Sequence, residues 1–346
     1  MRSLSRTDLA DIVEGAGLFG SGGGGSVRGA RQMLEAAPDA VRVVDVDDVL
    51  DGGACAVPAC IGAPTTMGGA TAVPAAAAFR ELAAWAASSG RAPLTAVMPG
   101  ELGAVNTLVA CLVAAELDLP VIDADGAGRS IPELTMATFA AEGVSLDPTF
   151  LVSRDGQTAT IHPPDASHAE HLARPVVERF GGMAGFATWY MDAASVARAA
   201  PIRGTLELAR GVGALLRTTE DPVASVVAHL SDRGARKLVR GRITALSEHE
   251  AGGFDFGRIE ITGANGQVIH VDAENENLVA RGGDDVLAAL PDLLCMMTTA
   301  GSPFSHADLD EVRDEEIALI TLRCDPALRS AALMPVFAEA LQRVGT

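Results

Sequence analysis

Short apolar runs alternate with longer amphipathic runs through the first 150 residues. The short runs predict strands, whereas the longer runs repeat apolar positions every three to four residues and predict helices. The predicted strands cover residues 41–46, 54–61, 94–98 and 120–123. The predicted helices cover residues 27–37, 74–88 and 106–117, after an amino-terminal helix that begins near Thr7. This alternation predicts a largely parallel sheet wrapped by helices.

The pattern changes after about residue 150, where helical patterns come first and a series of predicted strands follows. Helical patterns are predicted at residues 162–174 and 205–216, on either side of a small, apolar segment at 181–191. From Lys237 onward the chain predicts strands at residues 238–247, 257–262, 267–272 and 317–322. We therefore predict an α/β fold, with a three-layer α/β/α domain over residues 1–165. A mainly β domain, barrel- or sandwich-like with flanking helices, is predicted over residues 166–346.

Composition narrows the class of protein. The 346 residues are 48% hydrophobic and carry a formal net charge of -19, which argues against partners with phosphate backbones and against docking on anionic membranes. The sequence shows no apolar span of about 18 residues and no signal-peptide core, so we expect a cytoplasmic protein. The five cysteines are scattered and predict buried thiols, with a nucleophilic Cys60 or Cys111 as the alternative. We also expect a homo-oligomer.

Three loops follow a predicted strand and precede a helix or turn, at residues 62–69, 99–106 and 123–133. Ligands bind at this edge of open α/β sheets. The first loop offers Thr66 and Met67 as ligand contacts. In the second loop Asn106 can orient an amide or a carboxylate, and Glu101 can act as a general base. The alternative for Glu101 is an acid that only stabilises a helix N-terminus.

A glycine run at residues 20–26 lies between two predicted helices. Gly22, Gly23, Gly24 and Gly25 can present backbone N–H groups to an anion or a carboxylate. The run is not a Walker A loop, because no Lys-Ser/Thr follows, and no strand leads into it as a dinucleotide fingerprint requires. The alternatives are a flexible linker and a close crossing of two backbones.

An acidic turn combines Asp123, Asp125, Arg129 and Glu133 directly after a predicted strand. Such a cluster can hold a water, a divalent cation or the N–H groups of a polar ligand. Neighbouring carboxylates also raise one another's pKa, which suits a general acid or base. The alternative is a structural turn, in which Asp125 caps a helix and Arg129 pairs with Glu133. The seven histidines form no metal pattern, and no Ser-His-Asp order is present.

Taken together, these motifs resemble the S-methyl-thiohydantoin desulfurase family, which is often encoded beside hydantoinase and oxoprolinase genes. The matching segments are Gly22–Gly25, Ile61–Pro64, Glu101 with Gly103 and Asn106, Asp123–Glu133, Glu170 with Arg174, Gly181-Gly182, and Pro291–Leu293. The run Asp-x-Asp-Gly-x-Gly-Arg-x-x-Pro-Glu is the most specific of them. The sequence departs from the family pattern at Ser26, Ala104 and Thr71. The resemblance implies an α/β/α domain followed by a β-rich domain.

The resemblance also implies hydrolysis at carbon 2 of a hydantoin-like ring, with release of a thiol or sulfide. Asp123 or Asp125 would then position the water or a ring N–H, with Glu101 as the alternative base. A divalent metal could be held by Asp123 and Asp125.

Further roles follow from the same hypothesis. Arg129 would bind a substrate carboxylate or fix Glu133, and the amides of Gly22–Gly25 would hold negative charge. The main alternative function is a non-catalytic subunit or ligand-binding partner of a hydantoinase-type amidohydrolase. A third interpretation is a nucleotide-binding enzyme that uses the glycine run.

Overall fold

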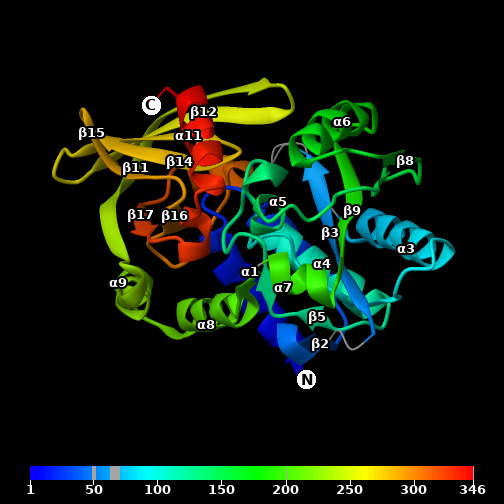
Figure 1. The fold of residues 1–346 in the computed structure, drawn as a ribbon. Coiled ribbons are helices and arrows are strands. Elements are labelled where there is room, and N and C mark those ends of the chain that lie inside the picture. Colours follow the sequence, from blue (N-terminus) through cyan, green and yellow to red (C-terminus); the bar gives the residue numbers. More distant parts are fainter. Residues whose placement is uncertain (49–51, 63–70, 200, 346) are drawn as a thin grey trace.

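The chain folds around two sheets that lie side by side, with helix α1 between them (Figure 1). The structure, a computed structural model, describes residues 1–48, 52–62, 71–199 and 201–345. The first sheet has helices on both faces, and the second is an antiparallel sheet that curls into a half-barrel. The predicted α/β class with a β-rich second part is therefore confirmed.

The first sheet has eight strands and is mixed rather than largely parallel. In sheet order the strands are β1 (Arg2–Ser5), β2 (Ala40–Val44), β5 (Val121–Ile122), β4 (Leu94–Val97), β3 (Ala54–Gly62), β9 (Met183–Asp192), β7 (Thr149–Val152) and β8 (Thr158–Ile161). Only β2, β5, β4 and β3 pair in parallel, and every other pair is antiparallel. The strands predicted at residues 41–46, 54–61, 94–98 and 120–123 form the parallel part of the sheet, and the antiparallel outer strands, which were not predicted, make the sheet mixed rather than largely parallel.

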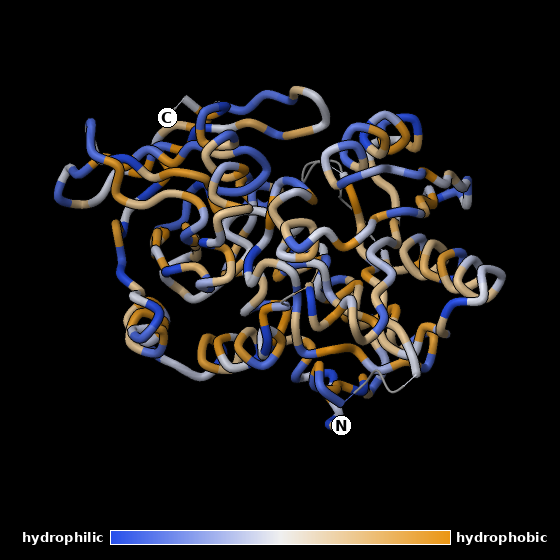
Figure 2. The backbone as a smooth tube through the Cα atoms, in the orientation of Figure 1, coloured by the Kyte–Doolittle hydropathy of each residue, from blue (hydrophilic) through white to orange (hydrophobic). Residues whose placement is uncertain are grey.

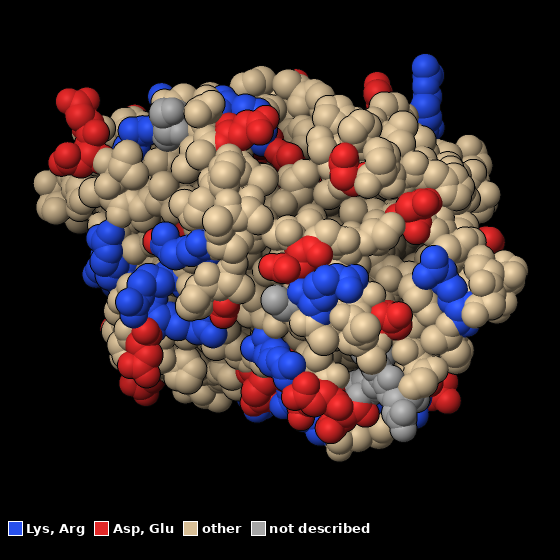
Figure 3. Space-filling model, viewed as in Figure 1, with Lys and Arg blue, Asp and Glu red and all other residues tan. Residues whose placement is uncertain are grey.

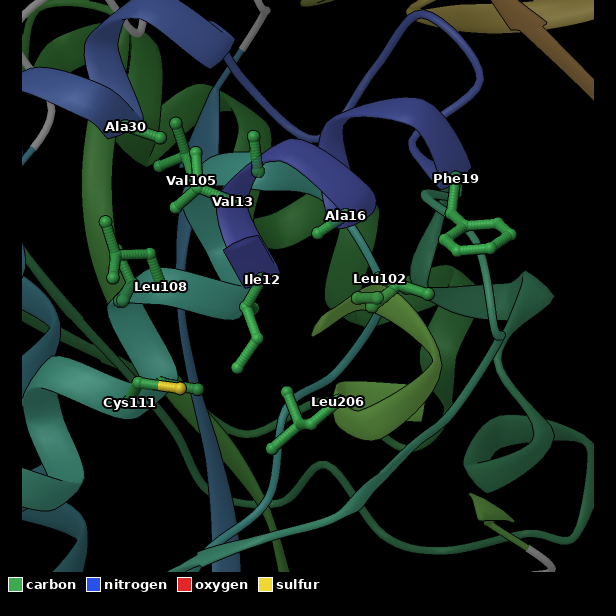
Figure 4. Packing of buried hydrophobic residues seen from close by; sticks show 14 of the residues in the cluster. Ile12, Val13, Ala16, Phe19, Ala30, Leu102, Val105, Leu108, Cys111 and Leu206 are labelled. Carbon is green, nitrogen blue, oxygen red and sulfur yellow. The ribbon is translucent and has the colours of Figure 1, made fainter. Parts of the chain in front are cut away.

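Helices cover both faces of this sheet, as predicted for three layers. One face packs against α3 (Val73–Ser88) and α4 (Ala104–Glu116), and α1 (Arg6–Phe19) lies on α4. The other face packs against α5 (Thr138–Ala141), α6 (Ala166–Arg179) and α7 (Ala193–Ala199). Apolar residues therefore concentrate in the inner strands and the helix faces toward them (Figure 2). Figure 4 shows Ile12 of α1 in the same core as Leu108 of α4 and Leu206.

The second sheet is antiparallel throughout. In sheet order its strands are β15 (Asp285–Ala289), β14 (Glu276–Gly282), β13 (Val268–Glu274), β12 (Phe254–Gly263), β11 (Arg236–Ala251), β17 (Ile317–Leu322) and β16 (Leu293–Thr298). The remaining elements are α2 (Val27–Met33), α8 (Thr205–Thr218), α9 (Pro222–His229), α10 (Leu309–Val312), α11 (Leu333–Arg343) and the small pair β6 (Ala124–Asp125) with β10 (Ile202–Arg203). Within the described part of the chain, no helix is long and apolar enough to cross a membrane.

The two halves interleave along the chain. Strand β9 lies between β3 and β7 in the first sheet, although the predicted division at residues 165/166 assigns it to the second domain. Helix α8, which precedes the second sheet, packs along α1. The surface carries acidic and arginine side chains next to one another (Figure 3), and many form ion pairs, such as Arg203 with Asp47.

Candidate functional site

A cavity of about 90 Å³ lies where the two halves meet. Its walls come from Gly24 and Gly25, the end of β3, the loop after β4, residues 131–134, α6, β9 and the β13–β14 connection. A buried water needs about 10–15 Å³ of such space, so the cavity has room for roughly six to nine waters. That is the size of a small heterocycle with few substituents.

Glu101 lies in this wall, on the loop between β4 and α4, and three donors hold its carboxylate. Asn106 Nδ2 donates to Oε1 at 2.7 Å, and Ile131 N and Ser130 Oγ each donate to Oε2 at 2.9 Å. The Asn106 Oδ1 accepts from Cys60 N at 2.9 Å, which fixes the amide so that its NH₂ faces Glu101. These bonds stabilise the ionised form of Glu101.

Glu276 lies in the other half of the chain, at the start of β14, and contacts the same Ser130 hydroxyl as Glu101. Ser130 Oγ lies 2.7 Å from Glu276 Oε1, while Glu276 Oε2 has no hydrogen-bond partner among the described residues. One hydroxyl hydrogen cannot serve two carboxylates at once. We therefore infer that Ser130 donates to Glu101 and accepts a hydrogen bond from Glu276, whose carboxyl group is then neutral.

The electrostatics agree with this assignment. Burial, together with the negative charge of Glu101, raises the pKa of Glu276 to about 8. Burial also raises the pKa of Glu101, against which Asn106, Ile131 and Ser130 act. The hydrogen bonds to Glu101 and the raised pKa of Glu276 thus favour one carboxylic acid and one carboxylate in the pair, as general acid–base chemistry needs.

The glycine run passes directly over this pair and is fixed at many points. Gly22, Gly24 and Gly25 have φ of +91°, +72° and +84°, which disfavour other residues. A Cβ on Gly23 would lie 1.8 Å from Glu276 Oε1, and one on Gly24 would lie 2.5 Å from the Gly103 Cα. The run is therefore a close backbone crossing, one of the two structural alternatives, and not a flexible linker.

The second half of the chain holds the glycine run in place. Asn277 N donates to Ser21 O at 2.7 Å, and His306 N donates to Gly22 O at 2.7 Å. Ser26, the N-cap of α2, donates to Asp308 at 2.5 Å. Of the four glycines proposed as ligand contacts, Gly24 and Gly25 line the cavity, and the other two are not among its lining residues.

Trp189 forms part of the apolar wall opposite the acids and has an unusual backbone. Its φ is +49°, a left-handed value that is costly for a bulky residue. The ring is buried, packs edge-on against Phe139, and leaves its Nε1–H without a partner among the described residues. Strain of this kind concentrates at binding and catalytic sites.

Neither Asp123 nor Asp125 is among the residues that line this cavity, although Asp125 Oδ2 is buried without a partner among the described residues. Asp123 pairs with Arg2 and accepts hydrogen bonds from Leu206 N at 2.8 Å and Glu207 N, at the start of α8. Asp125 accepts from the amides of residues 127 and 128 in a turn, and burial raises its pKa to about 6. Asp125 does not cap a helix, because residues 126–133 form none. In the described residues no group of three or more His, Cys, Asp or Glu could hold a metal ion.

The predicted pairing of Arg129 with Glu133 is wrong. Arg129 is fully buried and donates to Ser130 O and to the carbonyls of Asn277, Pro291 and Asp292 in the second half. These bonds join the two halves and leave Arg129 away from the cavity walls. Glu133 does line the cavity, but its partner is Arg343 of α11.

Two further predictions concern other residues. Thr66 and Met67 lie outside the described residues. All five cysteines are free and buried, and burial raises the pKa of the Cys60 and Cys111 thiols to about 12, which makes them poor nucleophiles. The prediction of buried cysteines is confirmed.

The sequence interpretation missed Glu276 and Trp189. A signal existed for Glu276, because the polar run Glu274–Asn277 interrupts two apolar strands. Asn275 adopts φ of +56° in that turn; its N donates to Asp255 O and its side-chain Oδ1 accepts from Asp255 N, which places the next residue at the cavity. No local pattern distinguishes Trp189 from other buried aromatic residues.

Comparisons with known proteins agree with the fold. The chain is similar to a protein from Chromobacterium violaceum whose crystal structure came from structural genomics, with 31% sequence identity and a TM-score of 0.89. That match covers 100% of this chain and 98% of the other. No curated protein matches the chain. Residues 7–163 match the model of the S-Me-THD-like N-terminal domain, and residues 164–340 match that of the S-Me-THD-like C-terminal domain. The chain therefore belongs to the S-Me-THD-like family.

Proposed function

We propose that this protein is a hydrolase that removes a thiol from carbon 2 of a small S-substituted thiohydantoin-type ring and leaves a hydantoin. One observation carries the proposal: a neutral Glu276 and an ionised Glu101, from opposite halves of the chain, share Ser130 at the wall of a ring-sized cavity. Membership in the S-Me-THD-like family supports the substrate class. The geometry favours these two glutamates over Asp123 and Asp125, because neither aspartate is among the residues that line the cavity.

The chemistry balances with these two groups alone. As the water oxygen bonds to carbon 2, Glu101 takes one water proton and Glu276 protonates the ring nitrogen of the C=N bond. The adduct then breaks its carbon–sulfur bond. Glu101 returns its proton to the departing sulfur, and Glu276 takes the proton of the new hydroxyl as it becomes a carbonyl. The products are a hydantoin and a thiol, and both carboxyl groups regain their starting state.

The test is release of methanethiol from an S-methyl-thiohydantoin by the purified protein, followed with a thiol reagent. Glu101→Gln and Glu276→Gln should each lower kcat by about 10²–10⁴, the range for loss of a general acid or base. Glu35→Gln, an exposed glutamate, is the matched control and should leave the rate unchanged. Full activity in either cavity variant would contradict the proposal. Saturable binding of the ring without turnover would instead indicate a ligand-binding subunit.

A further inference from the structure

We propose that the cavity is the inner part of a two-part binding site, and that an adjoining outer groove binds a flexible, cationic substituent of the ring. The inference rests on the proposed function for the identity of the ring. It adds a specificity that the family relationship does not provide, namely which substituent the ring carries and which residues select it.

The outer groove lies between α6 and the β11–β12 hairpin. It has a volume of about 290 Å³, roughly three times that of the inner cavity, and is formed by Pro175, Val177 and Glu178 of α6 with Gly182 and the hairpin residues Glu250, Gly252 and Gly253. Gly62 and Arg174 line both spaces. The ring cavity and the groove therefore adjoin at Gly62 and Arg174, so a substituent on the ring that extends past Arg174 would enter the groove.

Arg174 fixes this junction. Its Nε donates to Glu170 Oε1 at 2.6 Å and its Nη1 to Gly253 O at 2.9 Å, and its guanidinium lies 4.1 Å from the centre of the Phe254 ring. These contacts hold the hairpin tip against α6. Glu170 offsets the charge of Arg174, so the junction itself contributes little net charge.

The inner cavity requires a polar ligand. Glu276 is 3% exposed, and its Oε2 has no partner among the described residues. A buried carboxyl oxygen without a hydrogen bond is costly unless a ligand or water supplies one. An N–H on the edge of a bound ring would satisfy it, which orients the ring with its polar edge inward and its substituent toward Arg174.

The charge of the groove selects the substituent. Glu178 and Glu250 are exposed, and neither forms an ion pair with any residue that the structure describes. Residues 63–70, which follow Gly62, contain no charged side chain that could neutralise them. Two unpaired carboxylates beside a narrow groove attract a cation and repel an anion. An aminoalkyl tail therefore fits the groove, and a carboxyalkyl tail does not.

The experiment compares three rings by isothermal titration calorimetry at low ionic strength. They are unsubstituted hydantoin, 5-(4-aminobutyl)hydantoin and 5-(2-carboxyethyl)hydantoin. The aminobutyl ring should bind at least about fivefold more tightly than the carboxyethyl ring, in keeping with exposed charge pairs. The difference should shrink as salt is added. Glu178→Lys combined with Glu250→Lys should reverse the order of the two tails and leave unsubstituted hydantoin unaffected.

The control is Glu81→Lys, an exposed site on α3 across the sheet from α6, which should keep the wild-type order. Equal affinity for the two tails, or an order that survives the double substitution, would overturn this inference. The proposed function would stand in that case if S-methyl-thiohydantoin is still turned over. If none of the three rings binds, the groove assignment fails, and the proposed function fails with it only if S-methyl-thiohydantoin is not turned over.

Discussion

Two acidic clusters lie near the junction of the halves, and they differ in whether they line the cavity. Asp123 and Asp125 are held by backbone amides and Arg2, and although Asp125 Oδ2 has no partner among the described residues, neither side chain is among the residues that line the cavity. Glu101 and Glu276 come from distant segments, share one hydroxyl and both line the cavity. The difference teaches that a dense acidic motif can serve the fold, whereas a carboxyl pair assembled from distant segments at a cavity wall marks the chemistry.

The largest loss of activity is expected when Glu276 is displaced while its carboxyl group is kept. Gly23→Ala places a methyl group 1.8 Å from Glu276 Oε1, and the carboxyl must move. We expect kcat for methanethiol release to fall at least about 100-fold, because misplacement by about 1 Å is enough for such a loss. The measurement is steady-state kinetics on protein shown by circular dichroism to be folded.

Gly211→Ala is the matched control for that substitution. Gly211 lies in α8, and an added Cβ meets nothing within 4 Å. This variant should keep the wild-type rate and gain slightly in stability, since alanine favours a helix. Wild-type kinetics in Gly23→Ala would mean that Glu276 need not hold its position beneath the glycine run, and the contrast would lose its basis.

A pH titration sharpens the comparison next. Burial raises the pKa of Glu276 to about 8 from an ordinary 4.5, so the folded protein keeps a proton that the unfolded chain has lost. Its contribution to the free energy of unfolding is therefore full below about pH 4.5 and is lost as pH rises toward 8. If Glu276 is the acid, kcat should also fall about tenfold per pH unit above pH 8.

Glu276→Gln provides the check on both curves. Its free energy of unfolding should depend less on pH between about 5 and 8 than that of the wild type, because glutamine has no proton to lose. The free energy of unfolding is measured by urea denaturation at several pH values. If it depends on pH equally in the wild type and in Glu276→Gln, Glu276 does not carry the shared proton.

The sequence predicted elements better than it predicted the site. Strand β3 and helices α3 and α4 lie within two residues of their predicted bounds, because their apolar periods are long and unbroken. The four strands predicted in the first domain became β2, β3, β4 and β5, and these pair in parallel. Strands β1, β7, β8 and β9, which pair antiparallel, were not predicted as strands at all.

The candidate site shows the same limit. Glu101 and Asn106 were predicted together because they share one loop and one helix turn, and the structure joins them at 2.7 Å. The prediction gave Asp123 and Asp125 the same importance, because side-chain type and spacing do not reveal whether a carboxylate is already satisfied. The pairing of Glu101 with Glu276 spans the two halves of the chain, and only the three-dimensional packing reveals it.

The smallest effect on turnover should come from the acidic turn itself. Asp123→Ala removes the acceptor at the start of α8 and the partner of Arg2, and helix-end acceptors of this kind contribute about 1–2 kcal/mol. We expect thermal or urea denaturation to show a loss of that size, with kcat within about twofold of the wild type below the melting temperature. Asp47→Ala, which breaks only an exposed pair with Arg203, is the control and should change stability little. A large loss of kcat in Asp123→Ala at unchanged stability would return the chemistry to the acidic turn, because a purely structural carboxylate cannot change the rate of a protein that remains folded.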